Sequence, residues 1–414
     1  MSSIPQATHA FGERTALFSA LRYRNYRLYW FGQQFSVLAQ NMEYVAESWL
    51  VLEITNSPLM LGLTGLTYAT PRILLALLGG VIADRADRKR IMIFTQGCTG
   101  CLFFILATLV VSGMVSLWQV LVLVFFSGCL RAFDRPSRVA LLPQMVPREQ
   151  MANAVALGST VWQSNRLIGP SVAGVLIYLT GVGPTLYVCW LGSVIAVFLW
   201  LMIRLEPVVP NESKQSLIRH IIDGLNFIRR NQVFYTLMGM TFFNSVFGMS
   251  YLVLMPVFAR DILHVGSQGY GFLQSGTGAG ALGGALLVAY LAGFQKKGWQ
   301  AVIGAIVFGN LLMGFAFSTS YSLSLGLVFM MGLANQLYLT SISTILQLRL
   351  PDELRGRVMG LYGLTWDLMP VGGAISGTIA EYAGAPAAIA MGGFLVAIMA
   401  LWVAVGLPRV RQLQ

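Results

Sequence analysis

Four polar residues in the first long apolar stretch have the spacing and the chemistry of a proton-binding site. Ser36, Gln40, Glu43 and Glu47 follow one another at intervals of four, three and four residues. In a helix this spacing places all four side chains on one face, with the two carboxyl groups one turn apart. Two like charges at that distance repel each other strongly in a medium of low dielectric constant. We therefore expect Glu43 or Glu47 to bind and release a proton as the protein works.

A purely structural interpretation of the two glutamates stays open. Arg131 and Arg166 also fall inside apolar stretches. Either arginine would neutralise a buried carboxylate in a fixed ion pair that needs no proton transfer. Asp367, an acid well inside an apolar stretch of the second half, is the second candidate for proton coupling, with Trp366 beside it.

Further polar and aromatic residues inside apolar stretches are candidates for lining a substrate cavity. A polar group is costly in hydrocarbon unless it faces a cavity or a partner. The neutral amides and hydroxyls among these residues would bind a substrate by hydrogen bonds. The expected lining residues are Gln40, Arg131, Asp134, Arg166, Trp162, Asn244, Tyr251, Asn335, Gln336 and Trp366.

Other chemistries lack the residues that they need. The sequence has no ATP-binding loop, no metal-ligand cluster and no nucleophile with a plausible base, and its three histidines are scattered. The four cysteines all lie in apolar stretches, which makes a disulfide framework implausible. Cys98 and Cys101 are best interpreted as small apolar side chains on a helix. The sequence predicts no enzymatic activity, no cofactor and no bound metal.

The elements that position these residues must be membrane helices. Of 414 residues, 56% are hydrophobic and only 10% are charged, whereas a water-soluble protein carries about a quarter of charged residues. Stretches long enough to cross a hydrocarbon core of roughly 30 Å are residues 28–52, 59–83, 91–112, 117–142, 153–179, 184–205, 233–257, 269–294, 299–318, 321–348, 356–380 and 386–407. We therefore expect an all-α membrane protein with twelve transmembrane helices.

The cationic residues predict the orientation of these helices. Most of the 27 Lys and Arg residues lie in every second connection, and such residues collect on the cytoplasmic side. Both termini are then cytoplasmic. The first 27 residues carry several charges and no adequate apolar core, so no cleavable signal peptide is expected. The formal charge of +11 does not indicate a nucleic-acid partner, because the basic residues are not gathered on one face.

A long polar interruption divides the twelve stretches into six and six. Within it, Leu217, Ile221 and Leu225 recur at helical spacing beside basic residues, which predicts an amphipathic helix on the cytoplasmic surface. We expect an N-terminal bundle over residues 1–206, a linker with this helix over 207–232, and a C-terminal bundle over 233–414.

The two halves also repeat. A shift of 204 positions carries Pro147 onto Pro351 and Trp162 onto Trp366. Parallel repeats of six helices are a transporter architecture, with the substrate site between the halves. Chance similarity among apolar helices is the alternative.

The connection after the second stretch carries a recognisable motif. It reads Gly80-Val-Ile-Ala-Asp84-Arg85-Ala-Asp87-Arg88, followed by two more bases. This resembles the signature loop of the major facilitator superfamily, in which a second glycine usually stands where this chain has Asp87. Residues 28–90 and 147–153 further resemble a bacterial branch of efflux proteins related to the enterobactin exporter and macrolide efflux proteins. The resemblance implies two pseudo-symmetric six-helix bundles, with helices 1, 4, 7 and 10 around a central cavity.

The same resemblance implies roles in gating. The aspartate of this loop holds helix 2 against the start of helix 11 when the cytoplasmic side is closed, and its place is taken here by Asp84. The physical reason is that an anion is favoured at a helix N-terminus. Arg138 and Arg357 are the expected partners of Asp84, and Arg85 and Arg88 belong to the same loop. A solvated basic loop that serves only topology is the alternative.

A second motif lies in the fifth stretch. Gly169-Pro170-Ser-Val-Ala173-Gly174 resembles the Gly-Pro-x-x-Gly-Gly motif associated with antiporters of this superfamily, with Ala173 where a glycine is usual. The resemblance implies a bend and a close helix contact that seals one side. A structural kink without any meaning for antiport is the alternative.

These features predict a secondary active transporter that works by alternating access. We expect a proton-coupled exporter (antiporter) of amphipathic small molecules, such as drugs or a siderophore, in the bacterial cytoplasmic membrane. A proton-coupled importer of a polar metabolite, a lipid or lysolipid flippase, and a scaffold or sensor are the alternatives. The expected partners are a small-molecule substrate, protons and the lipid bilayer, with no nucleic acid, and the protein is expected to be a monomer.

Overall fold

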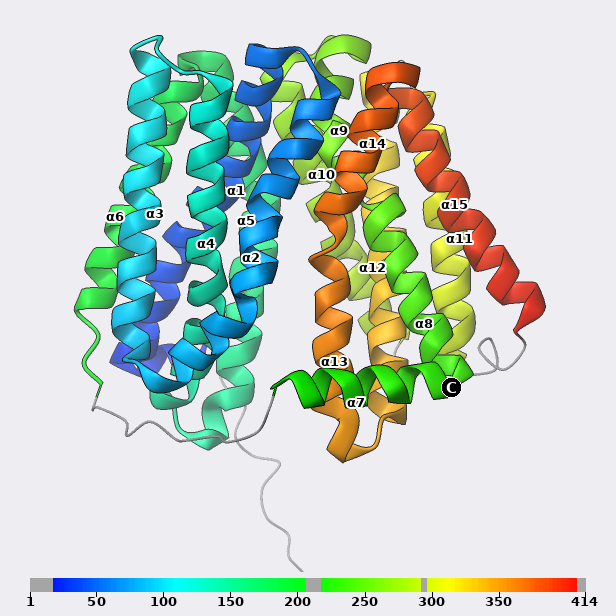
Figure 1. The fold of residues 1–414 in the computed structure, drawn as a ribbon, viewed down its shortest axis with the longest axis horizontal. Coiled ribbons are helices and arrows are strands. Elements are labelled where there is room, and N and C mark those ends of the chain that lie inside the picture. Colours follow the sequence, from blue (N-terminus) through cyan, green and yellow to red (C-terminus); the bar gives the residue numbers. More distant parts are fainter. Residues whose placement is uncertain (1–17, 206–216, 292–295, 408–414) are drawn as a thin grey trace, which may run out of the picture.

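The computed structural model describes residues 18–205, 217–291 and 296–407, while the side chains of residues 76–85, 217–221 and 223 lie outside that description. Within these ranges every regular element is a helix (Figure 1). Among the residues that the structure describes, eight helical runs are long and apolar enough to cross a membrane, judged by length and composition alone. Helix is the expected form, because a chain in hydrocarbon must satisfy its backbone polar groups internally.

The first half of the chain forms one group of packed helices, called here the N-terminal group. α1 packs against α5 and α6, α2 against α4, and α3 against α4 and α6. Short 3₁₀ turns precede α1 and join α4 to α5. The members are α1 (Arg24–Thr55), α2 (Pro58–Arg85), α3 (Arg88–Val111), α4 (Leu117–Leu141), α5 (Met151–Thr180) and α6 (Val182–Leu201).

The second half forms the C-terminal group. α12 packs against α10 and α11, and α15 packs against α11, α8 and α14. The members are α8 (Gln232–Phe243), α9 (Tyr251–Val257), α10 (Gly266–Tyr290), α11 (Lys297–Ala316), α12 (Tyr321–Arg349), α13 (Asp352–Trp366), α14 (Met369–Ala383) and α15 (Ala385–Gly406).

One amphipathic helix lies across the end of the C-terminal group. α7 (Leu217–Arg230) runs along the lower edge of the molecule in Figure 1 and contacts α8 and α13. Ile222 and Leu225 on this helix are exposed, as are Arg229 and Arg230. We call this side of the molecule the α7 end and the opposite side the far end.

The expected helix over residues 356–380 is in fact two helices. α13 ends at Trp366 and α14 begins at Met369. Pro370, in the first turn of α14, has no N–H to donate, and its ring conflicts with a continuous helix before it. Asp367 is the C-cap residue of α13, directly after its last residue.

The expected helix over residues 233–257 is also interrupted. A π-helical turn, Asn244–Gly248, separates α8 from α9, and a second, Phe258–Ile262, follows α9. Gly372 of α14 packs directly against the carbonyl of Val246, an approach that leaves no room for a side chain. Insertions of this kind are frequent at functional sites.

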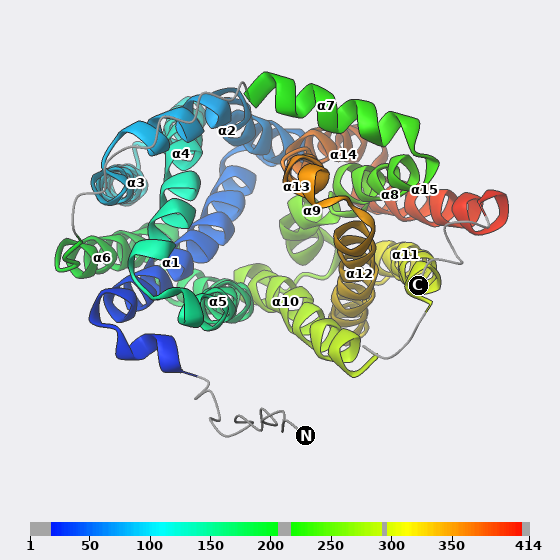
Figure 2. The ribbon, with the colours of Figure 1, turned by 90° about the horizontal axis from the view of Figure 1, so that it is seen from below.

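The two groups meet along two pairs of helices, α2 with α14 and α5 with α10 (Figure 2). Glycines permit the close approach in both pairs. A Cβ atom placed on Gly62 of α2 would lie 2.6 Å from the carbonyl oxygen of Gly373, and one placed on Gly377 would lie 2.6 Å from that of Pro58. Pro58 and Gly62 lie where α2 begins, so the groups are tightly packed at the far end.

Candidate functional site

Glu43 and Glu47 lie together on α1, each half-buried. The two carboxyl groups interact electrostatically with each other, and Glu43 also interacts with Arg131 of α4. Within the part of the chain that the structure describes, neither glutamate has an ion-pair partner within 4.0 Å. Arg131 lies instead 3.9 Å from Asp134. The fixed ion pairs of the structural interpretation are therefore not formed in this arrangement.

Arg138 and Asp134 belong to a buried network inside the N-terminal group. Arg138 Nε donates to Asp134 Oδ1 at 2.8 Å, and its Nη2 donates to Ser36 Oγ and to Gln96 Oε1, both at 3.1 Å. Its guanidinium also lies 4.5 Å from the centre of the Trp200 ring. Asp134 and Arg138 are each only 7% exposed. The network connects α1, α3, α4 and α6, and it connects to the glutamate stripe because Ser36 belongs to both.

This geometry bears on two of the expected roles. The sequence analysis assigned Asp134 to the cavity and Arg138 to a gate with Asp84. The structure places Asp134 and Arg138 against each other, away from the contacts between the groups. The side chains of Asp84 and Arg85, and Gly80 with them, lie outside the description, so the gate between Asp84 and Arg138 or Arg357 stays a prediction.

The two other expected gate residues lie towards the α7 end. Arg88, at the start of α3, donates from Nη1 to the carbonyl of Ala140 at 3.2 Å. Arg357 of α13 faces α7, where a Cβ atom placed on Gly224 would lie 3.5 Å from its Cβ.

Asp367 forms an ion pair with Arg72, and this pair crosses from one group to the other. Arg72 belongs to α2, and its guanidinium also lies 5.5 Å from the centre of the Tyr68 ring. The Arg72 and Asp367 side chains are 30% and 20% exposed. The sequence analysis named Asp367 but missed its partner, Arg72. The position of this arginine inside an apolar stretch was a signal that could have identified it.

The contact between the groups ends at this ion pair on the side of α13. Gly356, Gly360 and Gly363 precede Asp367 at spacings that place them on its face of the helix. A Cβ atom placed on any of the three would meet nothing within 4 Å. Among the side chains that the structure describes, this face of α13 therefore has no close neighbour towards the α7 end, in contrast to the glycine contacts at the far end.

Arg166 and Tyr251 approach each other from opposite groups. Arg166 of α5 interacts electrostatically with the Tyr251 hydroxyl of α9. Trp162 lies one turn before Arg166 on α5 and is 50% exposed. Two expected cavity residues, Arg166 and Tyr251, thus interact between the groups.

The neutral amides of the C-terminal group mainly bind one another. Asn335 Nδ2 donates to Asn244 Oδ1 at 2.9 Å, and both residues are buried. Gln336 Nε2 donates to Thr340 Oγ1 at 2.9 Å. Both bonds lie within the C-terminal group. Trp366 is half-buried against the apolar residues around it.

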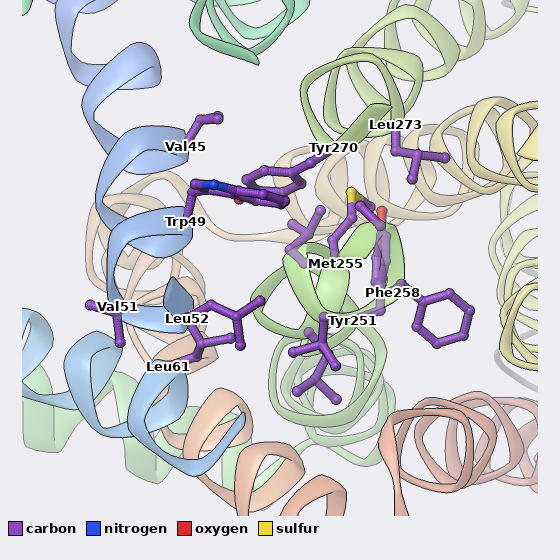
Figure 3. Close-up of a cluster of buried hydrophobic side chains, with 14 of the residues drawn as sticks. Val45, Trp49, Val51, Leu52, Leu61, Tyr251, Met255, Phe258, Tyr270 and Leu273 are labelled. Atoms are coloured by element: carbon purple, nitrogen blue, oxygen red, sulfur yellow. The ribbon is translucent and has the colours of Figure 1, made fainter. Parts of the chain in front are cut away.

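An apolar cluster joins α1 of the N-terminal group to α9 and α10 of the C-terminal group (Figure 3). Trp49 of α1 stacks on Tyr270 of α10, with ring centroids 6.1 Å apart. Phe258 and Met255, both fully buried, lie on the same side of this pair. The sequence analysis missed the cluster, because nothing in a run of apolar residues shows which of them meet.

The Gly-Pro motif of α5 is divided between two contacts. A Cβ atom placed on Gly169 would lie 2.6 Å from Asn41 Cβ of α1, inside the N-terminal group. One placed on Gly174 would lie 2.6 Å from the carbonyl oxygen of Ser267, in the C-terminal group. The carbonyl of Pro170 faces Gly271 of α10.

We expect Gly174→Leu to prevent closure of the far end. Forcing two packed backbones apart costs about 1–3 kcal/mol, so the ratio of closed to open far ends should fall roughly five- to hundredfold. The rate at which a cysteine at the far end is labelled measures this ratio. Gly97→Leu on α3 is the matched control, because a Cβ atom there meets nothing within 4 Å. Equal labelling of the two variants would show that α5 and α10 do not form the seal.

Comparison with protein families gives one match over nearly the whole chain. The family model for transmembrane secretion effectors matches residues 15–414. Macrolide efflux protein A of Streptococcus pyogenes is 25% identical over 397 residues, covering 92% of this chain and 96% of that protein. The enterobactin exporter of Shigella boydii is 24% identical over 390 residues, covering 91% of each.

Two solved structures resemble the fold. The nucleoside transporter NupG superposes with a TM-score of 0.68 at 13% identity, covering 91% of this chain and 97% of that one. A bacterial homolog of the human lysosomal transporter Spinster, in an inward-facing and occupied conformation, superposes with a TM-score of 0.72 at 14% identity, covering 92% of this chain and 95% of that one.

Proposed function

Because the chain belongs to the transmembrane secretion effector family of the major facilitator superfamily, we propose that it is a proton-coupled exporter of amphipathic small molecules. It is an efflux-type transporter and not an enzyme, and it is a multi-pass protein of the bacterial inner membrane. Antiport, in which protons enter as substrate leaves, is the form of coupling that we propose.

We propose twelve transmembrane helices in two six-helix bundles, over residues 1–206 and 233–414, joined by the linker 207–232. The packing of α1 to α6 and of α8 to α15 into two groups supports this division. Cationic residues of the amphipathic helix α7 support a cytoplasmic α7 end. The arrangement is then inward-facing, with the far end closed and both termini cytoplasmic.

The observation that carries proton coupling is the state of Glu43 and Glu47. They are acids beside the contact between the groups, and within the described ranges no ion pair within 4.0 Å neutralises them. A carboxylate in such a place is expensive unless it takes up a proton or meets a mobile cation. Asp367 differs, because Arg72 already neutralises it.

The apolar and aromatic side chains near the glutamates support an amphipathic substrate. Tyr44 and Tyr270 interact electrostatically with Glu47, and Trp49 stacks on Tyr270. Aromatic walls with a few polar groups suit such ligands. The relatives named for macrolide efflux and for enterobactin export fit the same class. We propose drugs or a siderophore as substrates.

Transport into inside-out proteoliposomes tests this proposal. With an acidic lumen and no other energy source, protons should flow out of the vesicles. This flow should drive a macrolide or a catecholate siderophore to accumulate inside. Movement of substrate in the same direction as protons would favour an importer of a polar metabolite. Redistribution of a labelled lysolipid, with neither substrate moved, would favour a flippase.

We retain the gate at the α7 end as part of the proposal. Asp84 would close this side by meeting the start of α13, together with Arg138 or Arg357, and Gly80, Arg85 and Arg88 would shape its loop. The absence of a close neighbour at Gly356, Gly360 and Gly363 among the described side chains supports the view that this gate is released in the present arrangement.

A further inference from the structure

The turn between α1 and α2 exposes two helix ends to the C-terminal group. Asn56 ends α1 in a left-handed conformation, with φ of 52°, and α2 begins two residues later. The last carbonyls of a helix and the first N–H groups of the next have no partner within their own helix. The end of α1 therefore carries partial negative charge, and the start of α2 carries partial positive charge.

A cation from the C-terminal group binds the end of α1. Arg260 Nη1 donates to the carbonyl oxygen of Leu52 at 3.0 Å and to Asn56 Oδ1 at 2.8 Å. Leu52 is in the last turn of α1, so the guanidinium caps the negative end of the helix.

An anion from the same group binds the start of α2. Glu381 Oε2 accepts a hydrogen bond from Ser57 Oγ at 2.7 Å and lies 3.3 Å from the backbone nitrogen of Leu59, which also donates to it. The carboxylate thus satisfies one of the first N–H groups of α2. The sign of each charge matches the sign of the helix end that it meets.

Local structure holds both charges in place. Arg260 lies in the π-helical turn Phe258–Ile262, and Asp261 accepts from its Nε at 2.6 Å and from its Nη2 at 3.1 Å. Glu381 lies in the last turn of α14, one turn after Gly377, whose close packing on Pro58 fixes the distance between α14 and α2.

We propose that Arg260 and Glu381 form a two-point clamp on the α1–α2 turn that stabilises the closed far end. The proposal goes beyond substrate and coupling ion, and it rests on the proposed function only in requiring that the two groups separate. Because both charges come from one group and both helix ends from the other, opening the far end must break all four hydrogen bonds. The two residues position the gate and do not touch the substrate.

Distances between spin labels in nanodiscs test the clamp. Labels are attached through Met114→Cys and Phe317→Cys, two exposed positions in turns at the far end of the two groups, after serine replaces the four native cysteines. Arg260→Gln and Glu381→Gln should each raise the ratio of open to closed far ends by roughly three- to tenfold. The double variant should combine both effects, since the contacts break together.

Three further variants make the result specific. Arg260→Lys keeps the charge and should lie closer to the parent protein, whereas Arg260→Glu places an anion at the negative end of α1 and should exceed Arg260→Gln. Arg355→Gln removes a cation that pairs with Asp352 on its own helix, and it should leave the far-end distance unchanged. Elution volume and thermal unfolding report whether each variant is folded.

Unchanged distances in the single and double variants would overturn the clamp, as would a shift of equal size in Arg355→Gln. The measurement uses neither substrate nor a proton gradient. Its failure would therefore leave the proposed export function standing, and failure of export in proteoliposomes would leave the clamp to be judged on these distances.

Discussion

Glutamine in place of Glu43 or Glu47 should abolish uphill export while substrate binding persists. Glutamine keeps the size and most of the hydrogen bonding of glutamate but cannot bind or release a proton at physiological pH. Coupling between two ligands typically amounts to about 1–3 kcal/mol, so gradient-driven accumulation should fall roughly 5- to 150-fold. Transport into proteoliposomes with and without a pH gradient measures this, together with equilibrium binding of the same substrate.

Competition between proton and substrate adds a dependence on pH. If both bind in the space beside the two carboxyl groups, protonation removes the charge that the substrate meets. Substrate affinity should then fall as the pH is lowered from about 8 to 5, the range in which a carboxyl group in a buried site binds a proton. In the double variant Glu43→Gln, Glu47→Gln this dependence should vanish. Glu149→Gln is the matched control, because Glu149 lies exposed in the turn before α5.

One combination of results would remove the two glutamates from the mechanism. The parent protein would show a substrate affinity that does not change over that range of pH, and both single glutamine variants would still export at the full rate. Two possibilities would then be left: coupling through Asp367, or a uniporter that needs no proton.

Breaking the ion pair between Arg72 and Asp367 should separate the two groups and slow transport. The pair is partly buried, and removing one partner leaves a charge without its counter-ion in a place of reduced solvation. We expect a cost of about 1–3 kcal/mol, between the values for exposed and for buried pairs. Asp367→Asn and Arg72→Gln should each weaken the contact between α2 and the α13–α14 break roughly five- to hundredfold.

A charge swap distinguishes this pair from two independent roles. Arg72→Asp combined with Asp367→Arg should recover part of the transport lost in either single variant, because the pair is restored with reversed sign. The pair of Asp352 with Arg355, at 2.7 Å within α13, is the control, since it is exposed and crosses no contact between the groups. Additive losses in the swap would mean that the two residues do not act through each other.

The sequence by itself determined the class of the protein and the face of α1 that carries its acids. Hydropathy acts locally, because each apolar stretch must satisfy its own backbone as a helix whatever its neighbours are. The spacing of Ser36, Gln40, Glu43 and Glu47 is likewise a property of one helix. The family resemblance needed only contiguous motifs, and the match over residues 15–414 confirmed it.

Only the tertiary structure decided which charges meet. Arg72 and Asp367 are 295 residues apart, and their pairing depends on how α2 and α13 are rotated about their axes. Arg138 meets Ser36 of α1 and Gln96 of α3 for the same reason, a choice that no single stretch of sequence records. Its pair with Asp134, by contrast, is a contact one turn apart within α4. The rotations are set by close glycine contacts between distant helices, such as Gly62 with Gly373. Partner choice therefore belongs to the packing of the two groups, whereas helix formation belongs to each stretch alone.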